Sequence, residues 1–293
     1  MNQHLGVPTI LGVPFDGESS YLRGAADAPA KIRAALRCDA SNMWTELGVD
    51  LGVPGAFEDA GDLEISEGYA FRGGGENPHF SQHQGEMGHP DTQNIFAAIE
   101  ERVGSLLDLD KRPVLLGGDH SITFPIMKAN AKHHAGLTIL HFDAHPDLYD
   151  EFEGDRLSHA CPFARIMEAG LAKRLVQVGI RTATKHQREQ AARFGVEMIE
   201  MRALPGQDKL KADGPVYVSF DMDVLDPAFA PGVSHREPGG MSVREAIAHL
   251  HAIRGEIVGA DLVEYNPVQD VAGVTATVAA KLLKEILGRM ISE

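Results

Sequence analysis

Short apolar runs alternate with helical patterns from one end of the chain to the other. Each run is apolar at consecutive positions, which is typical of strands in a parallel sheet that is covered on both faces. The predicted strands are Thr9–Val13, Val114–Leu116, Leu137–Phe142, Leu175–Val178, Val196–Ile199, Val216–Phe220 and Ile257–Leu262.

Apolar residues with the 3.6-residue period predict helices over Asp91–Leu107, over Ser242–Ile253 with Ser242 as N-cap, and from about Val274 to Met290. Alternating strands and helices predict an α/β sandwich around a parallel sheet. With no internal repeat and no dividing linker, residues 1–293 are expected to form a single domain.

The stretch Arg72–Pro90 differs, because it is rich in glycine and poor in apolar residues. It predicts a loop. We expect its histidines, His79, His83 and His89, to be solvated rather than metal ligands, since no predicted strand or helix fixes them.

Charge and cysteine content narrow the class of partner and the compartment. The 293 residues include 42 acids and 27 bases, a net charge of −15, which disfavours nucleic acid and anionic lipid. No apolar run approaches the roughly 20 residues that cross a bilayer. The first residues show no secretory signal. Cys38 and Cys161 are the only cysteines, so we expect a reducing, cytoplasmic location.

Three predicted strands lead directly into acids and histidines. Val114–Leu116 precedes Gly-Gly-Asp-His120-Ser, Leu137–Phe142 precedes Asp143-Ala-His145-Pro-Asp147, and Val216–Phe220 precedes Asp221-Met-Asp223. The carboxyl ends of parallel strands meet at one edge of the sheet, where ligands bind. Residues two apart in an extended segment share a side. These side chains should therefore face one cavity.

The resulting group combines four carboxylates with two imidazoles. Four carboxylates this close require countercharge, which divalent cations supply. Six ligands are too many for one tetrahedral zinc and suit a two-metal site with shared carboxylates, and this oxygen-rich set favours manganese. The candidate ligands are His120, Asp143, His145, Asp147, Asp221 and Asp223. Individually, such acids would more often be helix caps.

At these residues the chain resembles the ureohydrolase family, which includes arginase and agmatinase. The similarity extends over nearly the whole chain and is greatest to plant-type arginases and their bacterial relatives. The motifs that carry it are Gly117-Gly-Asp-His-Ser121, Asp143-Ala-His-Pro-Asp147, Ser219-Phe-Asp-Met-Asp223, Leu225-Asp-Pro-Ala-Phe-Ala-Pro-Gly232, Leu148-Tyr-Asp-Glu-Phe-Glu-Gly154, Ser158-His-Ala160, Phe163-Ala-Arg-Ile-Met-Glu168 and Gly232-Val-Ser-His-Arg-Glu-Pro-Gly-Gly240.

The resemblance implies a three-layer α/β/α sandwich around a parallel sheet of about eight strands, and two Mn²⁺ per chain. One ion would be held by His120, Asp143, Asp147 and Asp221, and the other by Asp143, His145, Asp221 and Asp223. The implied reaction is hydrolysis of a small-molecule guanidino substrate to urea and an amine. Family members form homotrimers or homohexamers, so a homo-oligomer is expected.

Two further residues receive catalytic roles. His159 matches the family's proton-shuttle histidine, and an imidazole suits that role because its pKa lies near neutrality. Glu264 follows the strand Ile257–Leu262, and a carboxylate there can accept a guanidinium through two hydrogen bonds. The family places its guanidinium-binding Glu at this motif.

The remaining polar residues near the motifs are expected to support the structure. Asp119 and Asp226 would form turns, Cys161 would pack, and His141 would point away from the metals. His235 is a candidate for substrate contact.

The end of the substrate remote from the guanidinium is poorly specified. Animal-type arginases place Asn and Ser before the shuttle histidine, whereas Asp155, Arg156, Leu157 and Ser158 lie there in this chain. Asp155 could bind an amine, and Arg156 could bind a carboxylate. We expect L-arginine as substrate, with agmatine as the alternative and other guanidino compounds after it.

Two readings from other classes stay open. A metal-binding paralogue without turnover is disfavoured by the complete ligand set, His159 and Glu264. A deacetylase-type hydrolase would need one zinc ion and a pair of catalytic histidines.

Overall fold

The computed structural model describes residues 6–65, 90–204 and 210–292. The predicted loop with His79, His83 and His89 therefore lies outside the described residues. Among these residues the strands are β1 (Val7–Gly12), β2 (Glu58–Asp62), β3 (Lys111–Leu116), β4 (Thr138–Phe142), β5 (Arg174–Ile180), β6 (Glu197–Glu200), β7 (Lys211–Asp221) and β8 (Arg254–Val263). The helices are α1 (Ala28–Leu36), α2 (Pro90–Asp108), α3 (Thr123–His133), α4 (Pro162–Glu168), α5 (Lys185–Phe194), α6 (Val243–Ala252) and α7 (Val274–Ile291).

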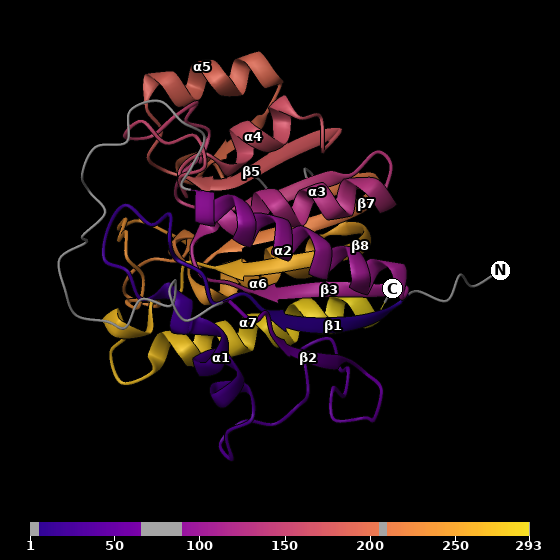
Figure 1. The fold of residues 1–293 in the computed structure, drawn as a ribbon. Coiled ribbons are helices and arrows are strands. Elements are labelled where there is room, and N and C mark those ends of the chain that lie inside the picture. Colours follow the sequence, from indigo (N-terminus) through magenta and orange to yellow (C-terminus); the bar gives the residue numbers. More distant parts are fainter. Residues whose placement is uncertain (1–5, 66–89, 205–209, 293) are drawn as a thin grey trace.

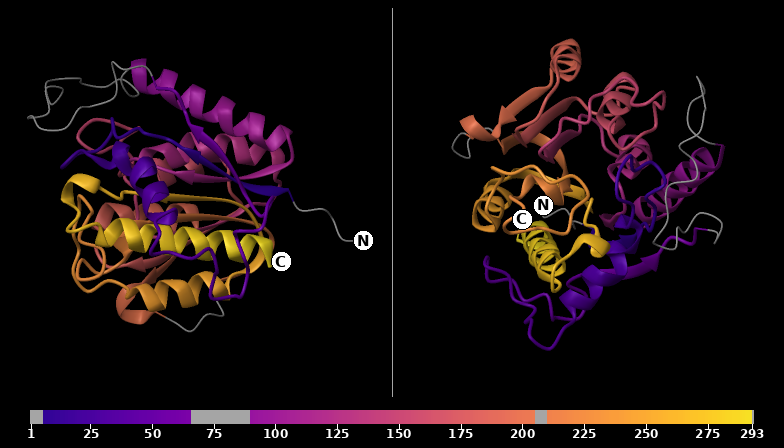
Figure 2. Two further views of the ribbon diagram at one scale, coloured as in Figure 1. Left: turned by 90° about the horizontal axis from the view of Figure 1, so that it is seen from below. Right: turned by 90° about the vertical axis from the view of Figure 1, so that its left-hand side faces the viewer.

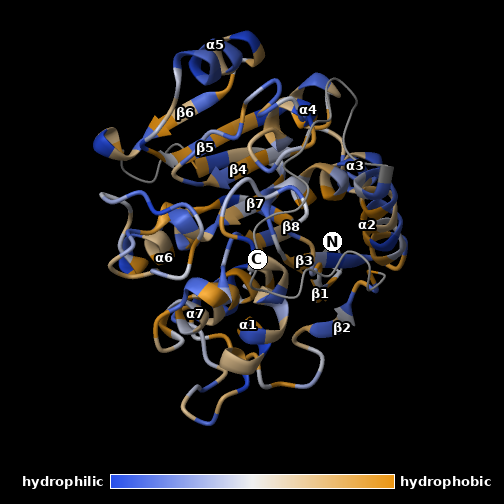
Figure 3. Cartoon of the chain, turned by 60° about the vertical axis from the view of Figure 1, so that its left-hand side comes forward, coloured by the Kyte–Doolittle hydropathy of each residue, from blue (hydrophilic) through white to orange (hydrophobic). Residues whose placement is uncertain are grey.

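All eight strands join one parallel sheet in the order β2-β1-β3-β8-β7-β4-β5-β6. Helices α2, α3 and α4 cover one face, and α1, α6 and α7 cover the other (Figures 1 and 2). The expected three-layer α/β/α sandwich is thus confirmed. Hydrophobic residues concentrate in the strands and on the sheet-facing sides of the helices (Figure 3).

Alternating residues of each strand enter the two cores. Leu140 and Phe142 pack in the core beneath α1, α6 and α7, whereas Ile139 packs in the core beneath α2, α3 and α4. This alternation explains the consecutive apolar positions in the sequence, because both faces of each strand are buried. It also decides which polar residues reach each face near the site.

The predicted helices are present, and Ser242 caps α6 as expected. Its side chain accepts a hydrogen bond from the backbone of Glu245, whose own side chain returns to the backbone of Ser242. The edge strand β2 was missed. Its sequence, Glu-Asp-Ala-Gly-Asp, is unfavourable for a strand, and its acids instead pair with Arg33 and Arg37 of the α1 region.

Candidate metal centre and active site

The expected cluster of acids and histidines lies at the carboxyl ends of β3, β4, β7 and β8. After β3 the chain turns at Gly117-Gly118, and a Cβ on Gly118 would lie 1.6 Å from the backbone oxygen of Phe15. Only glycine permits this close approach. The turn leads into a 3-10 helix, His120–Ile122, whose N-cap Asp119 accepts from the backbone of Ser121.

His120 faces three carboxylates with one ring nitrogen. Its Nδ1 lies 3.3 Å from Asp143 Oδ2, 3.1 Å from Asp147 Oδ2 and 3.2 Å from Asp221 Oδ2. All four side chains are buried. Among the described residues, Nδ1 has no hydrogen-bond partner. Each of the three carboxylates therefore brings one oxygen close to the same ring nitrogen.

A second group surrounds His145. Its Nδ1 lies 3.0 Å from Asp223 Oδ2 and 3.5 Å from Asp143 Oδ1. Asp221 joins the two groups, since its Oδ1 accepts the backbone N–H of Asp223 at 2.7 Å. Asp143 belongs to both groups, one oxygen to each. The structure thus brings together all six predicted ligands.

The electrostatics of the cluster call for positive charge. Burial lowers the pKa of His120, but Asp143, Asp147 and Asp221 outweigh this and hold it well above its usual value. Burial and the neighbouring carboxylates Asp223 and Asp143 raise the pKa of Asp221 well above its usual value. Both shifts reflect carboxylates crowded together in a buried site. Two triads in the cluster have ligand atoms close enough together to hold a divalent metal ion: His120, His141 and Asp143, and Asp143, His145 and Asp223.

Backbone geometry also marks the cluster. Asp147 and Glu264 adopt left-handed conformations, with φ of 48° and 62°. Non-glycine residues rarely do so, and such strain is held only where the surroundings fix it. Here it turns two acidic side chains towards the same rim of the sheet.

The expectation that His141 points away from the metal-binding residues is wrong. Its Nε2 lies 2.7 Å from Asp143 Oδ2, and its Nδ1 lies 3.1 Å from Gln177 Nε2. The reason is the two-residue period of β4, which puts His141 and Asp143 on the same side of the strand. The ring stacks on Phe163 of α4, with centroids 3.8 Å apart.

His159 and Glu264 lie together beside the first group. His159 Nδ1 is 3.4 Å from Glu264 Oε1, and its Nε2 is 2.8 Å from Ser20 Oγ. Glu264 Oε1 also accepts the backbone N–H of His120 at 2.9 Å. Burial lowers the pKa of His159, but Glu264 outweighs it and raises the pKa above its usual value. Burial raises the pKa of Glu264, but His159 outweighs burial and lowers the pKa below its usual value.

The loop of residues 16–24 forms one wall of the site, although no motif in the sequence predicts this. Besides Ser20, it contributes the Glu18 carbonyl, which accepts the backbone N–H of His159 at 3.3 Å. Asp16 holds the loop by accepting from the backbone of Gly24 and Ala26. The available signal was its position after β1, whose carboxyl end meets the same rim.

His235 lies between His159 and His145. Its ring stacks on His159 with centroids 5.2 Å apart, and it meets His145 edge-on at 6.0 Å. Burial lowers the pKa of His235. These contacts place His235 at the rim, and its contact with substrate stays a prediction.

The structure places the residues expected to read the substrate tail in different settings. Asp155 accepts the backbone N–H of Leu157 at 2.7 Å and shares a hydrogen bond with the side chain of Glu18, whose pKa rises to about 9 through burial and that contact. Ser158 is buried, and its hydroxyl and carbonyl hold the following turn.

Arg156 is not brought into this group. Its guanidinium donates to Asp150 at 2.7 Å and to Glu168 at 2.9 Å, and Arg165 binds the same two acids. Its charge is therefore already paired. The sequence could not reveal this, because Asp150 and Glu168 lie on separate segments.

Asp119, Asp226 and Cys161 are supporting residues, as expected. Asp119 accepts from Ser121, Ser19 and the backbone of Glu18, which ties the two loops together. Asp226 accepts three backbone N–H groups within its loop. Cys161 is fully buried, and burial raises the pKa of its thiol. Asp119, Asp226 and Cys161 therefore support the structure around the six candidate metal ligands and are not counted among them.

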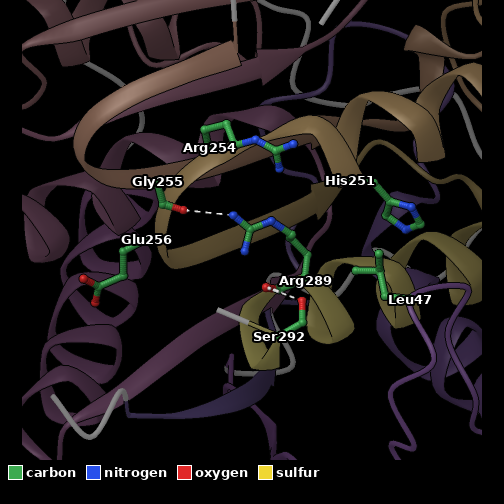
Figure 4. A pocket seen from close by; sticks show the side chains of 7 residues that line it. All are labelled: Leu47, His251, Arg254, Gly255, Glu256, Arg289 and Ser292. Atoms are coloured by element: carbon green, nitrogen blue, oxygen red, sulfur yellow. Dashed lines mark hydrogen bonds between the residues drawn. The ribbon is translucent and has the colours of Figure 1, made fainter. Parts of the chain in front are cut away.

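A pocket of about 450 Å³ lies elsewhere, at the amino end of β8 and the end of α7 (Figure 4). It is lined by Arg254, Gly255, Arg289 and Ser292, among others. Arg289 donates to the backbone oxygens of Ile253 and Gly255. This pocket is at the opposite end of the strand from Glu264, so it is separate from the metal-binding cluster.

Comparison with known proteins agrees with the geometry. The profile described as "Arginase family" matches residues 8–288. The chain belongs to the arginase family. Its members are metal-dependent hydrolases of guanidino substrates, which agrees with the cluster at the rim.

Individual relatives support this assignment. "Arginase, mitochondrial" from Medicago truncatula is 47% identical over 96% of this chain and 81% of the relative. "Agmatinase" from Bacillus cereus is 35% identical over 95% of this chain and 90% of the relative. The solved structure "Arginase from Medicago truncatula" has a TM-score of 0.86 at 44% identity, covering 98% of this chain and 88% of that one. The expected resemblance to plant-type arginases is confirmed.

The expected cytoplasmic location is contradicted by these comparisons, because the similar arginase is named as mitochondrial. The argument from two cysteines was too weak to decide, since it indicates only that disulfides are not needed. In the part of the chain that the structure describes, no helix is both long and apolar enough to cross a membrane.

Proposed function

We propose that this chain is an arginase, which hydrolyses L-arginine to L-ornithine and urea with two bound Mn²⁺ ions. One observation carries the proposal. Asp143 directs Oδ2 towards His120 and Oδ1 towards His145, so that a single carboxylate serves two adjacent donor groups. A carboxylate shared in this way is the arrangement that a two-metal site requires.

The proposed ligands divide as the family resemblance implies. His120, Asp143, Asp147 and Asp221 would hold one ion, and Asp143, His145, Asp221 and Asp223 the other. When bound, two such cations lower the pKa of water and supply a nucleophile near neutral pH. His145 is the more open histidine, with a quarter of its side chain exposed. Substrate would therefore enter from its side.

Glu264 and His159 would act on the substrate itself. Glu264 keeps a lowered pKa, so it is a carboxylate that can bind the cationic guanidinium. Glu264 raises the pKa of His159 despite its burial, which favours the protonated ring. The amine that leaves the guanidinium carbon must be protonated, and His159 would donate that proton. Ser20, hydrogen-bonded to His159 Nε2, would orient the ring.

Agmatine hydrolysis is the second candidate function, and Arg156 favours it. An arginase must accommodate the substrate carboxylate, but the guanidinium of Arg156 is bound to Asp150 and Glu168. Asp155 adds an acidic group near the rim, which suits the amine end of agmatine better than a carboxylate. Agmatine lacks the carboxylate.

A substrate panel tests the proposal. The Mn²⁺-loaded protein would be assayed for urea with arginine, agmatine, 4-guanidinobutyrate and guanidine. We expect the highest kcat/KM with arginine. At least tenfold higher kcat/KM with agmatine would replace arginase by agmatinase. No urea from any of the four would contradict both.

Two further properties are proposed with this function. The whole chain would form one domain, which the continuous sheet from β1 to β8 supports. The protein would form a homotrimer or homohexamer and bind no nucleic acid. Size-exclusion chromatography with light scattering measures the oligomeric state directly.

A further inference from the structure

A buried carboxylate lies directly beneath the proposed metal centre. Asp261 of β8 is 0% exposed. It accepts hydrogen bonds from three hydroxyl groups: Ser219 Oγ at 2.7 Å, Tyr217 Oη at 2.9 Å and Thr123 Oγ1 at 3.0 Å. Ser219 binds Oδ1, and the other two hydroxyls bind Oδ2. A carboxylate can only accept, so all three hydroxyls donate to it.

This fixes the direction of the hydroxyl of Ser219. A serine hydroxyl has one proton, and Ser219 donates it in a hydrogen bond to Asp261. The oxygen of Ser219 can then only accept from its other neighbour, His120 Nε2, at 3.0 Å. His120 must therefore carry a proton on Nε2.

The consequence appears at the other nitrogen of the ring. A neutral imidazole with its proton on Nε2 presents a lone pair at Nδ1. Nδ1 of His120 is the atom that faces Asp143, Asp147 and Asp221, and it has no hydrogen-bond partner among the described residues. In the neutral ring that binds a metal ion, this lone pair is directed between the three carboxylates, where it can hold the ion.

We infer that Asp261 and Ser219 are positioning residues, which fix the ring tautomer of His120 so that Nδ1 is ready to bind a metal ion. The inference rests on the proposed two-metal function. Metal-binding histidines commonly donate their second N–H to a carboxylate. In this chain Ser219 lies between His120 and Asp261. Because Ser219 donates to the acid, it can only accept from the histidine, so Asp261 sets the position of the ring proton through Ser219.

Asp261→Asn tests the direction of the hydrogen bonds at almost constant shape. The amide oxygen would occupy the position that accepts from both Tyr217 and Thr123, because reversing the amide would leave both hydroxyl protons without that acceptor. The amide N–H₂ would then donate to Ser219. The Ser219 hydroxyl would turn to donate to His120 Nε2, and the ring proton would move to Nδ1, where it blocks the metal.

The matched control is Tyr217→Phe. This substitution removes one hydrogen bond to Asp261 and keeps the aromatic ring in the core. Ser219 still donates its hydroxyl proton to Asp261. Ser219→Ala is a second test, because it removes the acceptor for His120 Nε2–H without touching Asp261. Metal-free thermal unfolding of each variant shows whether it is folded.

Mn²⁺ affinity and stoichiometry are measured on the intact chain by competition with a metal indicator and by elemental analysis. We expect Asp261→Asn to lower the affinity for at least one of the two Mn²⁺ ions by about 10- to 100-fold. Ser219→Ala should weaken it too, whereas Tyr217→Phe should stay within about threefold of the parent chain. In the Zn²⁺-loaded parent with ¹⁵N-histidine, His120 should show a protonated Nε2.

Parent-like affinity in Asp261→Asn would overturn the inference, as would equal weakening in Tyr217→Phe, which would indicate a purely structural effect. If Asp261→Asn does not fold, parent-like affinity in Ser219→Ala would overturn it. Failure of the proposed function looks different, because the parent chain itself would then release no urea or bind no pair of ions.

Discussion

One oxygen of Glu264 contacts both His159 and the loop that carries His120. Oε1 lies 3.4 Å from His159 Nδ1 and accepts the backbone N–H of His120 at 2.9 Å. The residue that would bind the guanidinium therefore also fixes the proton donor relative to the metal centre. A change at Glu264 should alter the proton affinity of His159 as well as substrate binding.

Glu264→Gln should move the pH profile of kcat. Burial lowers the pKa of His159, and Glu264 raises it above the usual value despite that. His159 donates only when protonated, that is, below its pKa. Without the neighbouring charge the pKa falls, so the alkaline limb of the profile that reports His159 should shift to lower pH. An unchanged limb in a full pH titration would contradict the pairing.

His159→Ala should lower kcat by about 10² or more, which is within the range for general acid–base catalysis. Its Mn²⁺ content should remain that of the parent chain, because His159 is not among the proposed ligands. Ser20→Ala should lower kcat by only about tenfold, since the ring stays present but less well oriented. Full urea release by His159→Ala would show that this histidine has no part in the reaction.

Asp143→Asn should remove both metal ions together. Asp143 gives one oxygen to each donor group, so the substitution weakens both. We expect elemental analysis after Mn²⁺ loading to fall from about two ions per chain to less than one. Asp39→Asn is the control. Asp39 is exposed and distant in sequence from the candidate ligands, so this variant should retain both ions. A variant at Asp143 that retains two ions would disprove the shared ligand.

Arg156→Ala should not change the preference between arginine and agmatine. The sequence suggested a contact with the substrate carboxylate, but the guanidinium is bound to Asp150 and Glu168. We expect kcat/KM for both substrates to change by the same factor. The melting temperature should fall slightly, because partly exposed ion pairs contribute only about 1 kcal/mol or less. A selective loss of arginine hydrolysis would restore the sequence-based role.

Only one of the two thiols should react in the folded protein. Cys38 is exposed, whereas Cys161 is buried and burial raises the pKa of its thiol. The thiolate is the reactive form, so Cys161 should stay unmodified. Titration with a thiol reagent at pH 8 should count one cysteine in the native state and two in denaturant. Rapid reaction of both in the native state would show that α4 opens.

The central strands and the six candidate ligands could be predicted from the sequence because two local patterns coincide. Buried strands leave consecutive apolar residues, and the acids follow directly where those runs end, as at Phe142–Asp143 and Phe220–Asp221. Strand ends meet at one rim in any parallel sheet, so proximity followed without knowledge of the strand order.

The missed features depend on contacts between distant segments. Ser20 meets His159 across 139 positions, and Asp261 meets Ser219 across 42. A lone serine has no local pattern that marks such a partner. The strand β2 was missed for a related reason, since its acids are stabilised by arginines of another element rather than by an apolar face. Only His141 could have been corrected from the sequence, by counting two residues to Asp143.

The strand order has a consequence for how the protein is made. β8 is the last strand of the chain, yet it lies in the middle of the sheet, between β3 and β7. As a chain leaves the ribosome, β1 to β3 and β4 to β7 are completed first, and two half-sheets with open edges must wait for it. His120 follows one half, and Asp143 and Asp221 follow the other. The donor group around His120 is thus complete only after the final strand has joined the two halves, and until then the strand edges that wait for β8 are open to pairing with other chains.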